Sequence, residues 1–279
     1  MHTQKSLEAD LERAGIRPSD TLLVHSSMKK IGLVDGGADT VIDAFLDYFR
    51  DNGLIVFPTL TFTIFHPFNP ETEKCQNCMK WSKPGYCLAK EWVGKKPEFH
   101  VNTTPACIGL LPNLFRVRPG VIRSLNPTHS LAAAGKDARD FTAGHETGET
   151  PCGKHSPWWK LYLRGAKILH LGSKVSNTTF MHGVDEWNRT EENPQAFLAQ
   201  QVDVYDQNER LVPMKPQRNT SGSSGRFPML EDAFERIGGL SRHKIGDADA
   251  ILLDCRKITE CTLDALAINP NLFGFQREI

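Results

Sequence analysis

The sequence predicts an α/β protein, in which one or more mixed sheets of buried strands are covered by helices. Three observations lead to this prediction. Short apolar runs bounded by turn residues recur along the chain, as at residues 21–25, and are typical of buried strands. Segments with apolar residues at helical spacing, as at residues 40–50, lie between these runs. The order strand, helix, strand over residues 21–57 is that of a βαβ unit.

The first half of the chain begins with a short amphipathic helix, which Gly15 and Pro18 end. The first strand leads into a loop at residues 26–37, where Gly32 and the pair Gly36-Gly37 give the backbone permissive positions. Helices are expected at residues 6–14, 40–50, 108–115 and 136–142, and strands at residues 21–25, 54–57 and 130–134.

The second half contains a clean apolar strand at residues 167–171, which ends at Gly172 and is followed by polar residues that start a helix. Residues 201–215 alternate in polarity and suggest a hairpin, and residues 219–225 form a Gly/Ser-rich loop. Helices are expected at residues 157–164, 177–188, 229–237 and 258–267, and a further strand at residues 250–254.

Residues 63–106 are rich in Pro, Cys, Lys and aromatic residues and show no period. We expect an irregular insertion here, within a single domain that spans residues 1–279, because loops this long are usually functional or braced by a metal. Cys75, Cys78 and Cys87 have the C-x2-C spacing of half a structural zinc site plus a third thiol. Unligated thiols fit the same pattern. A fourth zinc ligand would be His66, His100 or Cys107.

The composition excludes some partners. Thirty-three basic and thirty-three acidic residues balance each other, so charge indicates neither nucleic acid nor an anionic membrane surface. No apolar run approaches the roughly 20 residues that span a bilayer. The first fifteen residues form a charged helical pattern without the apolar core of a secretory signal. Seven cysteines are an odd count, so we expect free or metal-bound thiols rather than a disulfide framework, and a cytoplasmic location. We further expect a monomer or homodimer.

The first candidate site covers residues 24–32, which run from the end of a strand into a loop. Backbone N–H groups there can converge on a phosphate, and Lys29 and Lys30 add positive charge. Binding sites in α/β sheets gather at the carboxyl ends of strands. From spacing alone an ordinary loop with surface lysines is favoured, because no Walker or dinucleotide glycine pattern is present.

The second candidate site is His182, on the helix expected at residues 177–188. Asp185 follows it by three residues and Glu186 by four, which places both carboxylates on the face of the imidazole. A carboxylate on one ring nitrogen fixes the tautomer, so the other nitrogen can accept a proton. A surface histidine beside acidic residues is the alternative. His129, in a Pro-led turn, is more often a structural histidine.

Several motifs, in order, resemble the aminoglycoside 3-N-acetyltransferase family. They lie within residues 20–275, and as an ordered set they are specific for the family but not for a substrate. The motifs are LVHSSMKKIG at 23–32, GGA at 36–38, VFPT at 56–59, RSLNPTHS at 123–130, HSP at 155–157, LHLG at 169–172, NTTFMH at 177–182 and IGDA at 245–248.

The resemblance implies an α/β fold distinct from the common N-acetyltransferase superfold, and an acyltransferase of the antibiotic-resistance type. It implies acetyl-CoA as donor, the 3-amino group of an aminoglycoside as the small-molecule acceptor, and His182 as general base. The family places a Glu where Asp185 stands, so either Asp185 or Glu186 would orient His182. Family contacts to CoA map onto Ser26, Ser27, Met28, Lys29, Gly32, Ser130 and Ser156.

The sequence departs from the family pattern at Asn126, where a His is usual, and in the cysteine-bearing insertion, near where acceptor selectivity is built. An N–H group near residues 26–27, or the hydroxyl of Thr178 or Thr179, would stabilise the thioester oxyanion. Acidic residues around the pocket would attract a polycationic acceptor. Three alternatives stay open: a CoA-dependent acyltransferase acting on another amine metabolite, a CoA-binding protein without catalysis, and a zinc-dependent hydrolase.

Overall fold

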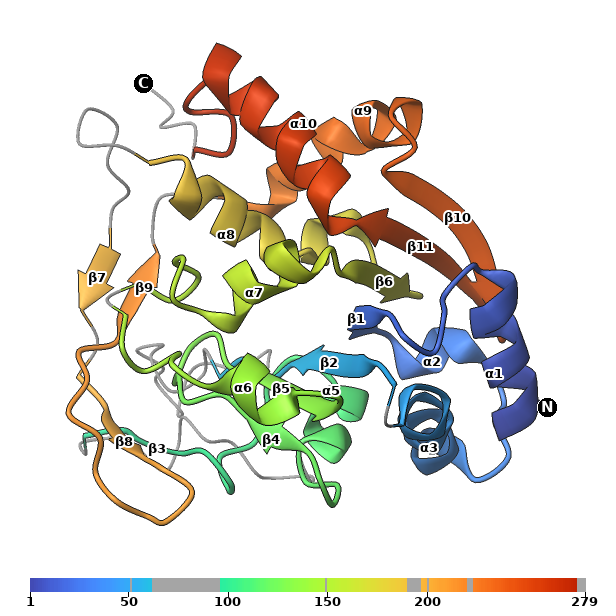
Figure 1. The fold of residues 1–279 in the computed structure, drawn as a ribbon, viewed down its shortest axis with the longest axis horizontal. Helices are drawn as coiled ribbons and strands as arrows, with labels where there is room; N and C mark the ends of the chain where they lie inside the picture. Colours follow the sequence, from blue (N-terminus) through green and yellow to red (C-terminus); the bar gives the residue numbers. More distant parts are fainter. Residues whose placement is uncertain are drawn as a thin grey trace, which may run out of the picture.

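A seven-stranded mixed sheet forms the centre of the molecule in the computed structural model (Figure 1). The structure describes residues 1–50, 52–61, 96–148, 150–189, 197–199, 201–219 and 223–274. The strands of this sheet are β1 (Thr21–Ser26), β2 (Leu54–Pro58), β4 (Ile122–Arg123), β5 (Leu131–Gly135), β6 (Lys167–Leu171), β10 (Leu240–Ile245) and β11 (Ala248–Asp254). Their order is β10-β11-β6-β1-β2-β5-β4. β1 pairs in parallel with β2 and β6, and the other pairs are antiparallel.

Helices cover both faces of the sheet, because side chains alternate along each strand. Leu22 and Val24 of β1 enter one hydrophobic core, whereas Leu23 enters the other. The first core is closed by α1 (Gln4–Arg13), α2 (Met28–Ile31), α3 (Gly37–Phe49) and α5 (Leu110–Phe115). The second is closed by α6 (Ala138–Thr142), α7 (Pro157–Arg164), α8 (Phe180–Trp187), α9 (Glu231–Arg236) and α10 (Cys255–Ile268), with the 3-10 helices η2 (Val175–Asn177) and η3 (Ser224–Leu230).

Two small sheets lie to one side of the main sheet (Figure 1). The strand pairs are β3 (Glu98–His100) with β8 (Asp203–Tyr205), and β7 (Phe197–Ala199) with β9 (Gln217–Asn219). A third, smaller core of Phe99, Val101, Val202 and Val204 packs around the β3–β8 pair.

The α/β prediction is confirmed, and most predicted elements match the observed ones to within a few residues. The hairpin predicted at residues 201–215 is only partly right: Tyr205 bridges Leu211, but β8 pairs with β3 instead. Strand β10 was not predicted from the sequence. It is an edge strand, so its central side chains are exposed or half-buried and do not form an apolar run. The loop expected at residues 26–37 contains the short helix α2.

Most of the insertion predicted at residues 63–106 lies outside the described residues, and so do Cys75, Cys78 and Cys87. In the part that is described, no three His, Cys, Asp or Glu side chains are grouped to hold a metal ion. None of the described helices is both long enough and apolar enough to span a membrane.

Candidate active site

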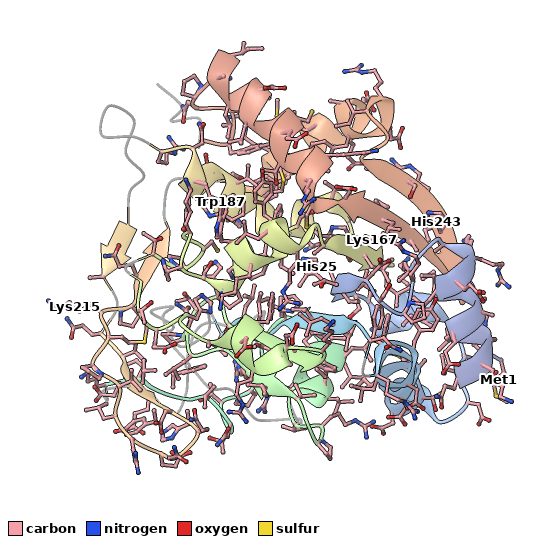
Figure 2. All side chains as sticks on the ribbon, viewed as in Figure 1. Met1, His25, Lys167, Trp187, Lys215 and His243 are labelled. Carbon is pink, nitrogen blue, oxygen red and sulfur yellow. The ribbon has the colours of Figure 1, made fainter. Side chains whose placement is uncertain are left out.

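A cavity of about 460 Å³ opens at the carboxyl ends of the three neighbouring strands β6, β1 and β2. This edge is where α/β sheets bind ligands, because the strands end there and the loops diverge. Figure 2 shows His25, the penultimate residue of β1, at the centre of the molecule. Of the predicted site residues, Ser26, Ser27, Thr179 and His182 line the cavity.

The chain turns sharply at the end of β6 to form one wall of the cavity. Gly172 has a φ of +68°, and a Cβ added there would lie 2.4 Å from the Cβ of Lys30. Only glycine fits this position without displacing the neighbouring backbone. The N–H of Ser27 donates to the carbonyl of Leu171 over 2.9 Å, which ties the loops after β1 and β6 together.

His182 lies in the first turn of α8 and is half-buried at the cavity. Its ring packs edge-to-face on Phe227, with centroids 4.9 Å apart. Burial lowers the pKa of His182 to about 4, so the ring is neutral at pH 7 and carries a lone pair that can accept a proton. His129 is close enough for the two histidines to oppose each other's protonation.

The two candidate carboxylates of α8 have partners away from this ring. Asp185 is buried and forms an ion pair with Arg189 at 3.2 Å. Glu186 accepts a hydrogen bond from the backbone N–H of Cys152 over 3.0 Å. Burial raises the pKa of Glu186 to about 8. Within the described residues, no hydrogen bond joins His182 to either carboxylate, so an orienting role for them stays a prediction.

Two predicted CoA contacts have hydroxyl groups that bond inside the protein. Ser130 Oγ donates to the carbonyl of Thr59 over 2.9 Å, and Ser156 Oγ donates to that of Gly153 over 2.7 Å. Both side chains are buried outside the described lining of the cavity.

The other three predicted CoA contacts lie on or just after α2, beside the cavity rather than in its described lining. Met28 packs partly against the first core, and Lys29 is exposed. A Cβ added to Gly32 would lie 1.9 Å from the carboxylate of Asp247, so this glycine allows α2 to approach the β10–β11 turn.

The charge that lines the cavity is positive only, within the residues that the structure describes. Lys174 is the single charged side chain at pH 7 among the lining residues that the structure describes, and no Asp or Glu is among them. The acidic surroundings expected from the sequence are therefore missing from this part of the site. A positively charged wall attracts phosphate groups and repels a polycation.

A buried arginine bonds to Thr59, which stands between the cavity-lining residues Pro58 and Leu60. Arg123 donates from Nε to Ser130 Oγ over 3.0 Å, and from Nη2 to the carbonyl of Thr59 over 2.6 Å. Its Nη1 donates to the carbonyl of Thr104, and its guanidinium lies over Phe99. Burial holds the pKa of Arg123 well below its usual value. These bonds join the end of β2 to the turn before β5.

That turn is organised by Asn126, the departure from the family pattern. Its Oδ1 accepts from the N–H of Thr128 and from the N–H of His129, over 3.0 and 2.8 Å. Trp158 Nε1 donates to the carbonyl of His129 over 2.9 Å. These bonds fix the position of His129, which was predicted to be structural, at a point where His182 helps to lower its pKa.

Ser173 and Lys174 are among the cavity-lining residues that were not predicted, and His25 was predicted only as part of the candidate segment 24–32, without a role of its own. His25 follows the apolar residues of the buried strand β1. Ser173 and Lys174 follow the end of β6. Their positions at strand ends were visible in the sequence. Which strand ends share one edge depends on the strand order, and a single sequence does not reveal that order.

The model of a family described as aminoglycoside 3-N-acetyltransferase matches residues 23–267. The chain is 33% identical over 186 residues to the SPbeta prophage-derived aminoglycoside N(3')-acetyltransferase-like protein YokD of Bacillus subtilis (strain 168), covering 64% of this chain and 63% of that protein. It therefore spans less than two thirds of the length of this relative. The chain is also 28% identical over 277 residues to aminoglycoside N(3)-acetyltransferase VII of Streptomyces paromomycinus. This match covers 92% of this chain and 89% of that protein.

Solved structures share the fold. The crystal structure of YokD matches with a TM-score of 0.78 at 25% identity, covering 96% of this chain and all of that one. A binary complex of AAC-IIIb with CoASH matches with a TM-score of 0.73 at 24% identity, covering 98% of each chain.

Proposed function

The chain belongs to the aminoglycoside 3-N-acetyltransferase family, and on this premise we propose that it transfers an acetyl group from acetyl-CoA to the 3-amino group of an aminoglycoside. The observation that carries the proposal is the position of His182. This neutral imidazole lines a cavity at the carboxyl ends of β1 and β6, together with Ser26 and Ser27. We assign His182 as the general base.

The size and the positive charge of the cavity support acetyl-CoA as the acetyl donor. It has room for a pantetheine arm, and Lys174 provides the positive charge that a phosphate group needs. AAC-IIIb, whose structure has the same fold, was solved with CoASH. We therefore assign Ser26, Ser27 and Lys174 to the CoA side of the reaction.

In the proposed reaction, the acceptor nitrogen attacks the thioester carbonyl carbon and forms an N–C bond while His182 removes a proton from the nitrogen. The carbonyl π pair moves to the oxygen and makes a tetrahedral oxyanion. When this intermediate collapses, the C=O bond re-forms and the C–S bond breaks. The imidazolium of His182 then protonates the departing thiolate, and the products are an amide and CoA.

We assign Asp185 and Glu186 a positioning role. The Asp185–Arg189 pair fixes the carboxyl half of α8, and the Glu186 bond to Cys152 fixes the loop beside it. Both contacts hold the helix that carries His182. Since Arg189 balances the charge of Asp185, and Glu186 is largely protonated at pH 7, the base remains neutral before the reaction.

Two kinds of acceptor are candidates for the proposed reaction. The family and the Streptomyces paromomycinus relative favour an aminoglycoside. The lack of acidic side chains in the described cavity lining favours a less charged amine metabolite as the second candidate. Retention of His182 argues against a CoA-binding protein without catalysis. We further propose that the protein is a cytoplasmic monomer or homodimer. We also propose a structural zinc on Cys75, Cys78 and Cys87.

An acetyl-CoA assay that measures thiol release tests the proposal. The acceptors are a kanamycin-type aminoglycoside, a gentamicin-type aminoglycoside and simple polyamines, and the controls omit either enzyme or acceptor. Turnover with an aminoglycoside, and acetylation of its 3-amino group by mass spectrometry and NMR, supports the first candidate. Turnover with polyamines alone supports the second. CoA binding without turnover on any amine overturns both.

A further inference from the structure

Two polar side-chain atoms of consecutive residues at the end of β1 have no hydrogen-bond partner among the described residues. They are Nε2 of His25 and Oγ of Ser26, and both are buried. Both residues also line the cavity that contains His182. Buried polar groups in proteins are nearly always hydrogen-bonded, and the exceptions concentrate where a ligand completes the bonding. His25 lies in the candidate segment 24–32, but no individual role was predicted for it.

A second histidine holds His25 in place. The ring of His170, on the adjacent strand β6, stacks on that of His25 with centroids 5.0 Å apart and planes 9° from parallel. His25 is 6% exposed and His170 is fully buried. This stacking fixes the plane of the His25 ring and leaves its edge as the part available for hydrogen bonding.

The hydrogen bonds of His170 define its tautomer. The hydroxyl of Thr178 donates to the carbonyl of Val175 over 2.6 Å, so the same oxygen accepts from His170 Nε2 over 2.8 Å. The neutral ring then has a lone pair on Nδ1, which accepts from the hydroxyl of Ser173 over 2.9 Å, a shorter contact than the 3.2 Å from the same hydroxyl to the carbonyl of His25. His170 is thus satisfied at both nitrogens and exchanges no proton with the ring stacked on it.

The surroundings of His25 keep it neutral as well. Burial lowers the pKa of His25 to about 3. A neutral imidazole carries one N–H, so His25 offers one hydrogen-bond donor on a ring that cannot rotate freely. A donor held in place before a ligand binds is what a developing oxyanion requires.

We propose that His25 is a further catalytic residue, which donates a hydrogen bond to the thioester carbonyl oxygen as that oxygen gains negative charge, with His170 as a positioning residue. This inference rests on the proposed acetyl transfer. The two cavity histidines then have different tasks. His182 accepts and returns the proton, whereas His25 keeps its proton throughout and stabilises charge on the oxygen.

The test compares His25→Leu with His25→Gln, since glutamine retains an N–H donor and cannot act as a base at neutral pH. We expect His25→Leu to lower kcat by about 10²–10³-fold, the usual effect of losing one oxyanion donor. We expect His25→Gln to recover part of this loss. Both variants keep the shape of the wild-type pH profile of kcat, because His25 transfers no proton.

A binding measurement separates this role from a structural one. The probes are CoA and a CoA analogue that carries an anionic, tetrahedral methylphosphonyl group in place of the acetyl group. Isothermal titration calorimetry should show that wild-type protein prefers the analogue, and that His25→Leu loses this preference while its affinity for CoA is unchanged. Equal weakening of both ligands, or full activity of His25→Leu, overturns the role of His25. Wild-type protein that binds neither probe overturns the proposed function itself.

His170 is tested with His170→Phe, which keeps a flat ring to stack on His25 but loses the bonds to Ser173 and Thr178. A positioning role predicts a lower kcat with an unchanged dissociation constant for CoA. Wild-type kcat in this variant overturns the role given to His170.

Discussion

His182 and Glu186 lie one helical turn apart on α8, yet their side chains have different neighbours. The ring of His182 packs on Phe227 and lines the cavity, whereas the carboxyl group of Glu186 accepts from the backbone N–H of Cys152. The acid is therefore part of the scaffold behind the base. Substitutions at the two positions should consequently affect different measurements, with stability responding at Glu186 and turnover at His182.

The first prediction concerns the pH dependence of stability. Burial raises the pKa of Glu186 from 4.5 to about 8, so between these values the folded protein binds a proton that the unfolded chain has lost. The contribution of Glu186 to the free energy of unfolding is therefore fully present below pH 4.5. It declines as the pH rises toward 8, by at most about 1.4 kcal/mol per pH unit.

Urea unfolding of the wild type and Glu186→Gln at pH 5, 6.5 and 8 checks this. Glutamine does not titrate and still accepts from Cys152, so the wild type should lose stability relative to the variant as the pH rises. A constant difference between the two proteins across this range would contradict the raised pKa of Glu186.

The second prediction concerns the charge of the cavity. Because Lys174 is the charged residue in the described lining, Lys174→Gln should weaken CoA binding by about tenfold, which corresponds to 1.4 kcal/mol, and should reduce its salt dependence. The acceptor KM should change little. Lys244→Gln is the matched control, since Lys244 is exposed and paired with Asp249. Equal effects of the two substitutions on the dissociation constant for CoA would remove Lys174 from the CoA site.

The third prediction concerns the buried guanidinium of Arg123. Arg123→Met removes the guanidinium donor to the carbonyl of Thr104 and one of the two donors to the carbonyl of Thr59, and we expect it to lower the free energy of unfolding by about 2–3 kcal/mol. Arg242→Met is the control, because Arg242 is an exposed partner of Glu231 and Glu235 and should cost less than about 1 kcal/mol. Denaturant unfolding measures both. Similar losses in the two variants would mean that Arg123 braces nothing.

The fourth prediction concerns metal. If Cys75, Cys78 and Cys87 bind a structural zinc, the purified protein contains about one zinc per chain, and Cys75→Ser loses it. Removing the metal with a chelator should lower the melting temperature, whereas the chemistry proposed for His182 needs no metal. Metal analysis and thermal unfolding of both proteins check this. Protein without zinc would leave the thiols unligated, and zinc that survives in Cys75→Ser would place the metal elsewhere.

Much of the fold could be predicted from local sequence patterns. Strands such as Lys167–Leu171 are short apolar runs ended by glycine, and α3 and α10 have apolar residues at helical spacing. The edge strand β10 could not be recognised, because it lacks the apolar run by which buried strands are predicted. Its exposed Arg242 and Lys244 are typical of a strand edge that faces solvent.

The candidate site was predictable in part. The ordered motifs led to His182, Ser26 and Ser27, which share the cavity. The partners of Asp185 and Glu186 were not predictable from helical spacing, which places a carboxylate on a helix face but does not reveal competing partners. Arg189 and the backbone of Cys152 supply those partners. His25 required knowledge that β1 lies beside β6.

The central claim is that His182 is the base, and kinetics of His182→Ala together with calorimetric titration of CoA tests it most directly. We predict that kcat falls by about 10²–10⁴-fold while the dissociation constant for CoA is unchanged. His243→Ala, at a half-buried position on the edge strand β10 and outside the described cavity lining, is the control and should behave like the wild type (Figure 2). Near-wild-type turnover by His182→Ala would contradict the account.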